Sequence, residues 1–226
     1  PGIPDLRAAA AGYFAKHYGV PADAEHIIVS NGGKHCLYNL CQALLNPGDH
    51  VLIPAPYWVS YPPMVELAAA KPVIITTAPE KDFKVTPADL EKSLTPKTRL
   101  LLLNSPSNPT GACYSKDELD AIAQWAVERG VVVVSDEIYD RLVYSGTPSL
   151  SLCSWWQKHP ENFVIVNGVA KTFAMTGWRV GYALAHPDLI RAMSRLQGQS
   201  TSNVCSVSQK AAVPALTGDM GVLEEI

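Results

Sequence analysis

Residues 131–137 read Val-Val-Val-Val-Ser-Asp-Glu, and this stretch decides the fold class. It is short, β-branched and preceded by Gly130, so it predicts a β-strand. Its valines are continuous rather than alternating with polar residues, which indicates a strand that is covered on both faces. Strands of this kind occur in mainly parallel sheets with helices on both sides. The stretch therefore predicts an α/β fold.

Further short apolar runs repeat this pattern along the chain. The predicted strands are residues 26–30, 50–53, 72–76, 98–103, 130–135 and 162–166. The predicted helices are residues 5–17, 34–45, 62–70, 87–93 and 116–129, and Ser115 and Glu118 form a capping-box pattern before the last of them. This alternation predicts a mainly parallel sheet with helices on both faces. Because no repeat or linker interrupts it, residues 1–226 are predicted to form a single domain.

The composition argues against several classes of partner. Hydrophobic residues make up 47% of the chain and charged residues 17%, a low charged share that favours a thick interior. The formal net charge is −3 and the basic residues are scattered, so neither nucleic acid nor an anionic membrane is expected as a partner. The five cysteines are widely spaced, which argues against a disulfide framework or a zinc site. Their spacing predicts buried free thiols in a reducing compartment.

Polar residues follow four of the predicted strands at the point where each strand ends. These segments are residues 31–34, 104–111, 135–139 and 167–171. In open α/β sheets, ligands bind at the carboxyl ends of the strands. The four segments are therefore expected to line one site.

The first segment, Asn31-Gly32-Gly33-Lys34, precedes a predicted helix. Backbone N–H groups at a helix N-terminus attract phosphate groups, and the helix dipole adds to this attraction. A tight turn that only caps the helix is an equally common role for two glycines. A triphosphate-binding loop is disfavoured, because Ile28 stands at its first glycine position and His35 follows the lysine where a hydroxyl is required.

Two charged residues stand in apolar surroundings at other strand ends. Asp136 needs hydrogen bonds or a cationic partner, which is either an arginine or the protonated ring nitrogen of a pyridine cofactor. Lys171 lies among glycine, valine and alanine, and burial there would make its amine a nucleophile able to form a Schiff base. Arg179, eight residues later, is able to hold a phosphate with two parallel hydrogen bonds.

Three successive motifs carry a resemblance to a known family. They are Ser105-Pro106-Ser107-Asn108-Pro109-Thr110-Gly111, Ser135-Asp136-Glu137-Ile138-Tyr139 and Lys171-Thr172-Phe173-Ala174-Met175-Thr176-Gly177-Trp178-Arg179-Val180-Gly181. In order and spacing they resemble the class I and II pyridoxal-phosphate (PLP) aminotransferases of fold type I, over essentially the whole chain. Residues 54–61 and 196–202 resemble the bacterial and plastid aspartate aminotransferase subgroup, which includes prephenate aminotransferases.

The resemblance implies which residues form the site. Lys171 is the implied catalytic residue, which holds PLP and then moves a proton as general base. The implied cofactor-binding residues are Gly32, Gly33, Lys34, Trp58, Asn108, Asp136, Tyr139, Lys171 and Arg179. The implied substrate-binding residues are Lys34, Trp58 and Asn108, with Lys34 recognising the distal carboxylate of an acidic substrate. No metal is expected.

Within this set the implied contacts differ. Asp136 would pair with the ring nitrogen, while Asn108 and Tyr139 would donate to the phenolic oxygen. Trp58 would stack on the ring, or would be only a core aromatic. The backbone of residues 32–34 and the side chain of Arg179 would hold the phosphate. Many relatives add a serine one or three residues before the lysine, but this chain has Ala170 and Gly168 there.

The implied function is transamination between aspartate or glutamate and a 2-oxo acid, with prephenate as one candidate acceptor. A homodimer with shared sites, a role in amino-acid biosynthesis and a cytoplasmic location are also implied, with organellar import left open. Compared with the family, the chain is expected to be truncated at both ends, without an N-terminal segment and a C-terminal small domain. Two alternatives stay open: another fold-type-I enzyme, such as a C–S lyase or an aminocyclopropane-carboxylate synthase, and a non-catalytic PLP-binding domain.

Overall fold

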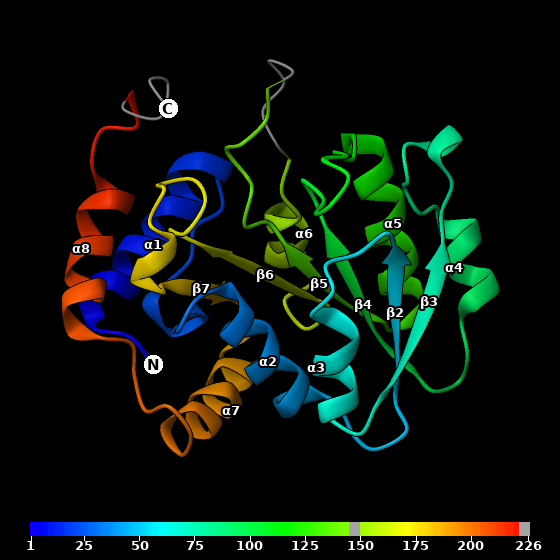
Figure 1. The fold of residues 1–226 in the computed structure, drawn as a ribbon, viewed down its shortest axis with the longest axis horizontal. Coiled ribbons are helices and arrows are strands. Elements are labelled where there is room, and N and C mark those ends of the chain that lie inside the picture. Colours follow the sequence, from blue (N-terminus) through cyan, green and yellow to red (C-terminus); the bar gives the residue numbers. More distant parts are fainter. Residues whose placement is uncertain (145–149, 222–226) are drawn as a thin grey trace.

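Seven strands form one sheet, in the order β1-β7-β6-β5-β4-β2-β3, in the computed structural model, which describes residues 1–144 and 150–221 (Figure 1). The strands are β1 (Ile27–Ser30), β2 (His50–Ala55), β3 (Lys71–Thr76), β4 (Thr98–Asn104), β5 (Val132–Asp136), β6 (Phe163–Gly168) and β7 (Gly181–Leu184). The strands from β6 to β3 pair in parallel, whereas β7 runs antiparallel to both β1 and β6. The prediction of a mainly parallel sheet is confirmed.

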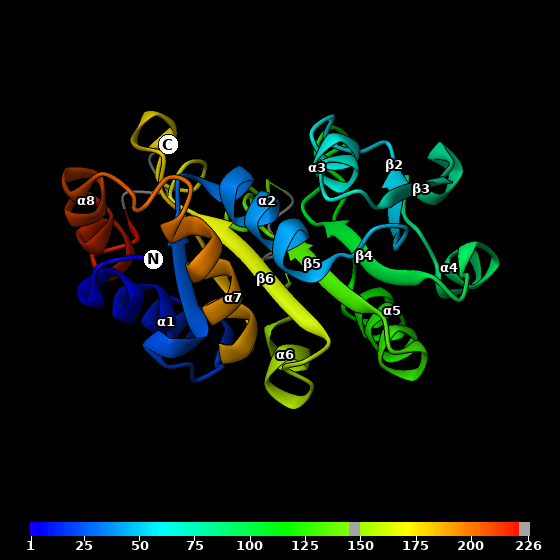
Figure 2. The same ribbon diagram turned by 90° about the horizontal axis from the view of Figure 1, so that it is seen from below.

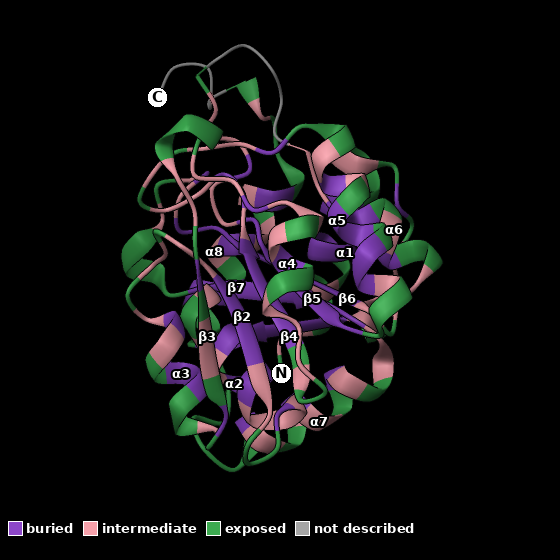
Figure 3. Cartoon of the chain, turned by 90° about the vertical axis from the view of Figure 1, so that its right-hand side faces the viewer, coloured by how far each residue is buried: buried purple, intermediate pink, exposed green. Residues whose placement is uncertain are grey.

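Helices cover both faces of this sheet, as predicted (Figure 2). They are α1 (Pro4–Tyr18), α2 (Gly33–Leu44), α3 (Tyr61–Leu67), α4 (Pro87–Ser93), α5 (Lys116–Arg129), α6 (Cys153–Lys158), α7 (Pro187–Gly198) and α8 (Ser206–Thr217). One hydrophobic cluster joins the sheet to α1, α4, α5, α6 and α8, and a second joins it to α2, α3 and α7. Strands β5 and β6 are buried along their whole length, while the edge strand β3 is partly exposed (Figure 3).

The local sequence explains where the helix before β5 begins and ends. The Ser115 hydroxyl accepts a hydrogen bond from the Glu118 backbone N–H, and the Glu118 carboxylate accepts one from the Ser115 N–H at 2.7 Å. This is the predicted capping box, which supplies partners for the free N–H groups of the first turn. Gly130 ends the helix with φ 65°, a conformation that favours glycine. The predicted helix 116–129 therefore has the same bounds in the structure.

One strand and three helices were not predicted. The strand, β7, has only four residues and pairs through tertiary contacts with β1 and β6. Among the helices, α6 has six residues and α8 contains Pro214, and both features lower the helix signal in the sequence. The helix α7 packs its apolar face on α2 and β1. Its sequence is amphipathic and begins with Pro187, so it carried a helix signal that the sequence analysis missed.

All five cysteines are free, but the prediction of buried thiols holds for only some of them. Cys36, Cys41 and Cys153 are buried, whereas Cys113 is half-buried and Cys205 is exposed. The prediction was wrong for Cys205, because this residue occupies the exposed position just before α8 and lies outside the core. Among the described residues, no helix is both long and apolar enough to cross a membrane.

Candidate active site

A cavity of about 230 Å³ lies beside the ends of β4, β5 and β6. Its lining residues are Gly33, Lys34, Trp58, Tyr61, Asn108, Asp136, Ile138, Tyr139, Ala170, Lys171, Thr176 and Arg179. Eight of the nine residues implied by the sequence are in this set. The ninth, Gly32, is the neighbour of Gly33 and lies against the Arg179 side chain. The structure thus brings all nine residues together, in the place where α/β sheets bind ligands.

The N-terminal turn of α2 is built from glycines because side chains do not fit there. Gly32 has φ 87°, and a Cβ added to it would lie 2.5 Å from Arg179 Nη2. Gly181 on β7 supports the turn from the other side, since a Cβ there would lie 2.2 Å from the backbone nitrogen of Gly33. The first turn of α2 carries no acidic residue, so the positive end of its dipole is not neutralised. The turn is therefore able to bind an anion.

Arg179 holds its guanidinium group beside this turn. Its backbone is in the left-handed region, with φ 55°. Nη1 donates to the carbonyl oxygen of Thr176 at 3.1 Å, and Nη2 donates to that of Asn31 at 3.4 Å. Within the described part of the chain, no carboxylate forms an ion pair with Arg179. The guanidinium is therefore fixed in place while its charge stays available to an anion.

Asp136 is a buried carboxylate that forms no ion pair with any cationic side chain of residues 1–144 and 150–221. Its residue is 6% exposed. The Tyr61 hydroxyl donates to Oδ2 at 2.7 Å, and the Ile138 N–H donates to Oδ1 at 3.3 Å. Burial raises the pKa of Asp136 to about 6, although both hydrogen bonds favour the ionised form. A carboxylate in this state favours a cationic ligand in the cavity.

The loop after β4 presents Asn108 to the same cavity. Asn104, at the end of β4, donates from Nδ2 to the backbone carbonyl of Asp136 at 2.8 Å. Its Oδ1 accepts the backbone N–H of Asn108 at 2.6 Å. These two bonds tie the loop to the end of β5, so that Asn108 and Tyr139 line one cavity from two neighbouring strands.

Lys171 follows β6 in a loop that is held by internal hydrogen bonds. The Thr176 hydroxyl donates to the carbonyl oxygen of Ala170 at 2.8 Å, and the Lys171 carbonyl accepts the N–H of Ala174 at 3.0 Å. Lys171 Nζ lies 5.5 Å from the centre of the Tyr139 ring. The residue is half-buried rather than buried, because its side chain lines the cavity and not the core. Its apolar neighbours in sequence led to the expectation of fuller burial, which was wrong.

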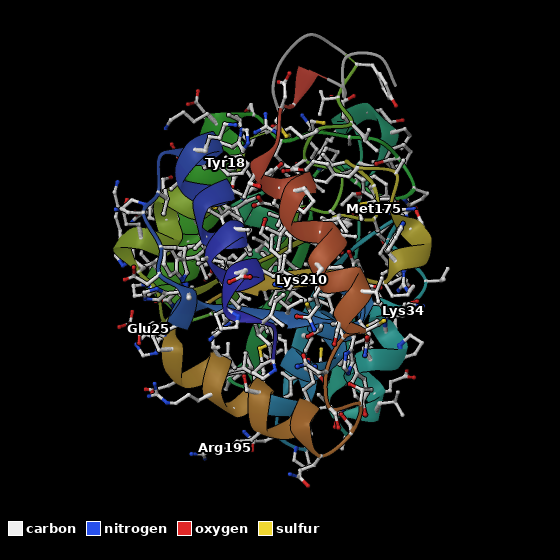
Figure 4. All side chains as sticks on the ribbon, turned by 90° about the vertical axis from the view of Figure 1, so that its left-hand side faces the viewer. Tyr18, Glu25, Lys34, Met175, Arg195 and Lys210 are labelled. Carbon is white, nitrogen blue, oxygen red and sulfur yellow. The ribbon has the colours of Figure 1, made fainter. Side chains whose placement is uncertain are left out.

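Lys34 and Trp58 form a pair at the same cavity. Lys34 Nζ lies 4.8 Å from the centre of the Trp58 ring, a distance typical of a cation–π contact. Trp58 in turn meets Tyr61 edge to face, with ring centres 5.5 Å apart. Trp58 thus packs partly against the core and also lines the cavity. In Figure 4, Lys34 on α2 and Met175 in the loop after β6 lie along the same edge of the molecule.

The sequence analysis gave no role to Tyr61, Ile138 or Thr176, which also line the cavity. Tyr61 is the most informative of these, because it is 2% exposed and its hydroxyl contacts Asp136. Burial, and next the charge of Asp136, raise the pKa of Tyr61 well above its usual value, so the phenol stays a donor. Its place three residues after Trp58, at a helix start, was a signal that the two rings lie together.

Fold and cavity together define an α/β protein that presents an amine, a carboxylate and a helix N-terminal turn suited to an anion to one cavity. The chain belongs to the family described as aminotransferase class I and II, whose model matches residues 1–226.

Named relatives agree with this assignment. The chain is 45% identical over 223 residues to an asparagine–oxo-acid transaminase of Streptococcus mutans, covering 99% of this chain and 57% of that protein. It is 46% identical over 216 residues to an aspartate/prephenate aminotransferase of Thermus thermophilus, covering 96% and 55%. A solved structure of aspartate aminotransferase from Thermus thermophilus with maleate matches with TM-score 0.94 and 44% identity, covering 99% and 58%. The chain therefore spans little more than half the length of these relatives.

Proposed function

We propose that the complete protein is a PLP-dependent aminotransferase that moves an amino group between an acidic amino acid and a 2-oxo acid. One observation carries this proposal: the Lys171 amine, the Asp136 carboxylate and the Arg179 guanidinium lie on a single cavity. Asp136 ends β5, Lys171 lies in the loop after β6, and Arg179 lies just before β7. Their meeting at one cavity is therefore a property of the fold.

The residues of this cavity fit PLP at three of its groups: the phosphate, the ring nitrogen and the aldehyde. The turn at Gly32 and the guanidinium of Arg179 suit its phosphate, because a Cβ at Gly32 would fill the space beside the guanidinium. Asp136 suits its ring nitrogen, because the carboxylate is buried without a cation. The amine of Lys171 suits its aldehyde. When bound, PLP supplies an electron sink for the charge that develops on the substrate's α-carbon.

The chain's own residues would then bind, orient and move protons. The Lys171 amine would hold the cofactor covalently and, once released by substrate, take the proton from the substrate's Cα. The Asp136 carboxylate would keep the ring nitrogen protonated, and Tyr61 would keep Asp136 oriented. The side chains of Asn108 and Tyr139 would donate hydrogen bonds to the ring's phenolic oxygen.

Lys34 supports the acidic substrate class. Its ammonium group lies at the N-terminus of α2, where the dipole already favours anions, and the guanidinium of Arg179 is available for the phosphate. This leaves Lys34 for a second anion, such as the distal carboxylate of aspartate or glutamate. Two of the relatives above are named for aspartate, and one solved relative was studied with maleate, which is a dicarboxylate. Prephenate as acceptor rests on the resemblance of residues 54–61 and 196–202 to the subgroup and on the name of the aspartate/prephenate aminotransferase of Thermus thermophilus.

We also propose that the complete protein is a homodimer of the same family type, with residues 1–226 forming its single cofactor-binding domain. A cytoplasmic location and a role in amino-acid biosynthesis are proposals that rest on the family resemblance.

The covalent role of Lys171 is tested by trapping the cofactor. The complete protein is loaded with PLP, reduced with borohydride and digested, and the labelled peptide is identified by mass spectrometry. The label is expected on Lys171 and is expected to be absent from a Lys171→Ala variant. A label on another lysine would contradict the assignment. Asp136→Ala should still bind PLP but transaminate about 100-fold or more slowly.

Nitrogen tracking separates transamination from the two alternatives. With ¹⁵N-aspartate and 2-oxoglutarate, an aminotransferase passes the label to glutamate, whereas a lyase or synthase releases other products. A non-catalytic PLP-binding domain would leave the label on aspartate. The name of each relative above, transaminase or aminotransferase, favours the first outcome.

A further inference from the structure

Asp140 is a buried carboxylate close to the cavity that the assignments above do not use. It is 2% exposed and follows the cavity residue Tyr139 by one position. Three hydroxyl groups donate to it. Tyr13 and Tyr18 of α1 donate to Oδ2 at 2.7 Å each, and Thr172 donates to Oδ1 at 2.8 Å. The carboxylate therefore joins helix α1, the turn after β5 and the loop that carries Lys171.

The bond from Thr172 is informative because Thr172 follows Lys171 directly. On the other side of the lysine, the Ala170 carbonyl accepts the hydroxyl of Thr176 at 2.8 Å. Two threonine hydroxyls thus fix the backbone on both sides of Lys171. The Thr176 bond stays inside the loop, whereas the Thr172 bond leads out of it to Asp140.

The two oxygens of Asp140 are held unequally. Oδ2 has two phenol donors, so the loss of one leaves the other in place. Burial, and next the charge of Asp140, raise the pKa of both Tyr13 and Tyr18, so these phenols remain donors. Arg141 adds a contact on the same side, since its Nε donates to the Tyr13 hydroxyl at 3.3 Å. The Thr172 hydroxyl is the one donor to Oδ1 among the described residues.

The two oxygens of Asp140 therefore have different functions. The phenols anchor the carboxylate to α1, whose C-terminal end carries Tyr18 in Figure 4. Thr172 attaches the lysine loop to the anchored carboxylate. Since Tyr139 precedes Asp140 in the chain, the same attachment holds the backbone next to Lys171 against the turn that carries Tyr139, and Lys171 Nζ lies 5.5 Å from the centre of the Tyr139 ring.

We propose that Asp140, acting through Thr172, is a positioning residue that fixes Lys171 relative to Tyr139. This inference rests on the proposed function, in which Lys171 holds PLP. Removing the Thr172 hydroxyl should release the lysine loop from the turn after β5. Removing the Tyr18 hydroxyl should weaken the fold but leave the loop attached, because Tyr13 still holds Oδ2.

The test compares Thr172→Val with the matched control Tyr18→Phe in the complete protein. Both variants lose one hydroxyl donor to the same carboxylate. The measurements are PLP affinity by fluorescence titration, hydrogen exchange of the Lys171 peptide in the cofactor-free protein, and urea unfolding. Thr172→Val should bind PLP about tenfold more weakly, the size expected for one lost bond to a buried charge, and its Lys171 peptide should exchange faster. Tyr18→Phe should keep affinity and exchange within about twofold despite a similar loss of stability.

Two further variants complete the design. Thr172→Ser keeps a hydroxyl and should restore affinity to within about twofold of the wild type. Asp140→Ala, which removes the acceptor, should weaken affinity at least as much as Thr172→Val does. The double variant Asp140→Ala/Thr172→Val should lose no more than Asp140→Ala alone, because Thr172→Val acts only through this bond.

Each contrary outcome has a defined meaning. Equal affinity losses in Thr172→Val and Tyr18→Phe would show that the cluster only stabilises the fold and would overturn the proposal. Unchanged affinity and exchange in Thr172→Val, or additive losses in the double variant, would overturn it as well. If the wild type does not attach PLP to Lys171, the proposed function fails instead, and the exchange data still report whether Thr172 holds the loop.

Discussion

Lys34 illustrates how one side chain can set a substrate preference. Its ammonium group contacts the face of Trp58 at 4.8 Å from the ring centre, so it is held at the cavity without an ion pair among the described side chains. A substrate with a distal carboxylate would provide that ion pair. A substrate with an alkyl side chain would displace water from the ammonium group and leave it unpaired, which costs free energy.

Lys34→Ala should therefore reduce kcat/KM for aspartate much more than for alanine or phenylalanine. Lys34 is exposed here, so the cost applies to a pair that the bound substrate shields from water: losing such a pair costs on the order of 2–5 kcal/mol, which corresponds to roughly 30- to 4000-fold. Steady-state kinetics with acidic and neutral donors measure the difference. Lys158→Ala, which removes another lysine from an aromatic face outside the cavity, is the control and should change neither. Equal losses for all donors would mean that Lys34 serves only the phosphate or the fold.

Tyr61 provides a test of the charge on Asp136. Burial raises the pKa of Asp136 from 3.8 to about 6. The folded, cofactor-free protein therefore binds a proton at Asp136 more tightly than the unfolded chain does. Stability from this group is therefore complete below pH 4 and is lost as the pH rises to about 6. The Tyr61 hydroxyl lessens this loss, because its hydrogen bond favours the carboxylate.

Tyr61→Phe should consequently destabilise the cofactor-free protein more at pH 8 than at pH 4. A hydrogen bond to a charged group is worth about 1.5–3 kcal/mol, against about 0.5–1.5 kcal/mol for a neutral pair. Urea unfolding of variant and wild type at both pH values gives the difference. Burial also raises the pKa of Glu137 to about 7, but Glu137 titrates in both the variant and the wild type. Its contribution therefore cancels when the two unfolding free energies are subtracted. If Tyr61→Phe loses the same stability at pH 4 and pH 8, Asp136 is not ionised in the folded protein at pH 8.

Single residues could be predicted from the sequence where an unusual residue type stands in an apolar setting. Asp136 and Lys171 stood out for this reason, and the cavity contains both. Tyr61 and Asp140 did not stand out, because their importance depends on partners 75 and more than 100 residues away. An aromatic residue beside two others looks like core until its hydroxyl partner is known.

At the scale of elements, the sequence predicted the strands and helices whose ends carry local signals. The helix α5 has a capping box and a terminal glycine, and its predicted bounds match the structure. The short strand β7 has no such signal, yet it supports the anion-binding turn through Gly181. What the sequence could not provide was the contact between two backbones, β7 and the turn before α2, because that contact is set by antiparallel pairing with β1.

Gly181→Ala tests this contact between elements. Its Cβ would lie 2.2 Å from the Gly33 nitrogen and 2.3 Å from the Gly32 carbonyl carbon, so the turn must move. PLP affinity is expected to fall about tenfold or more, since a buried clash typically costs 1–3 kcal/mol. Gly12→Ala is the control, because the added Cβ inside α1 would meet nothing within 4 Å beyond the neighbouring backbone of its own helix. It should keep affinity while stabilising that helix. Normal PLP affinity in Gly181→Ala would show that the turn does not bind the phosphate.

At the scale of the whole molecule, the cavity collects residues from position 33 to position 179. Large apolar side chains are exposed beside it: Val59 is 77% exposed next to the cavity residue Trp58, and Trp178 is 44% exposed next to Arg179. Exposed apolar groups at the border of a site are typical of surfaces that another chain covers. An interface of the proposed homodimer close to the cavity would cover both Val59 and Trp178.

Val59→Arg should therefore shift the complete protein from dimer to monomer and weaken PLP binding. The substitution places a charge on a side chain that is already exposed, so the fold itself should tolerate it, whereas an interface that buries the arginine without a partner would lose several kcal/mol. Sedimentation measures the oligomeric state, and fluorescence titration measures PLP affinity in the same samples.

Leu67→Arg is the matched control, because Leu67 is 68% exposed at the far end of α3 and does not line the cavity. It should leave both quantities unchanged. A wild type that is monomeric and fully active would contradict the homodimer itself. A Val59→Arg variant that stays dimeric would place the interface elsewhere, and Trp178→Arg would then be the next position to test.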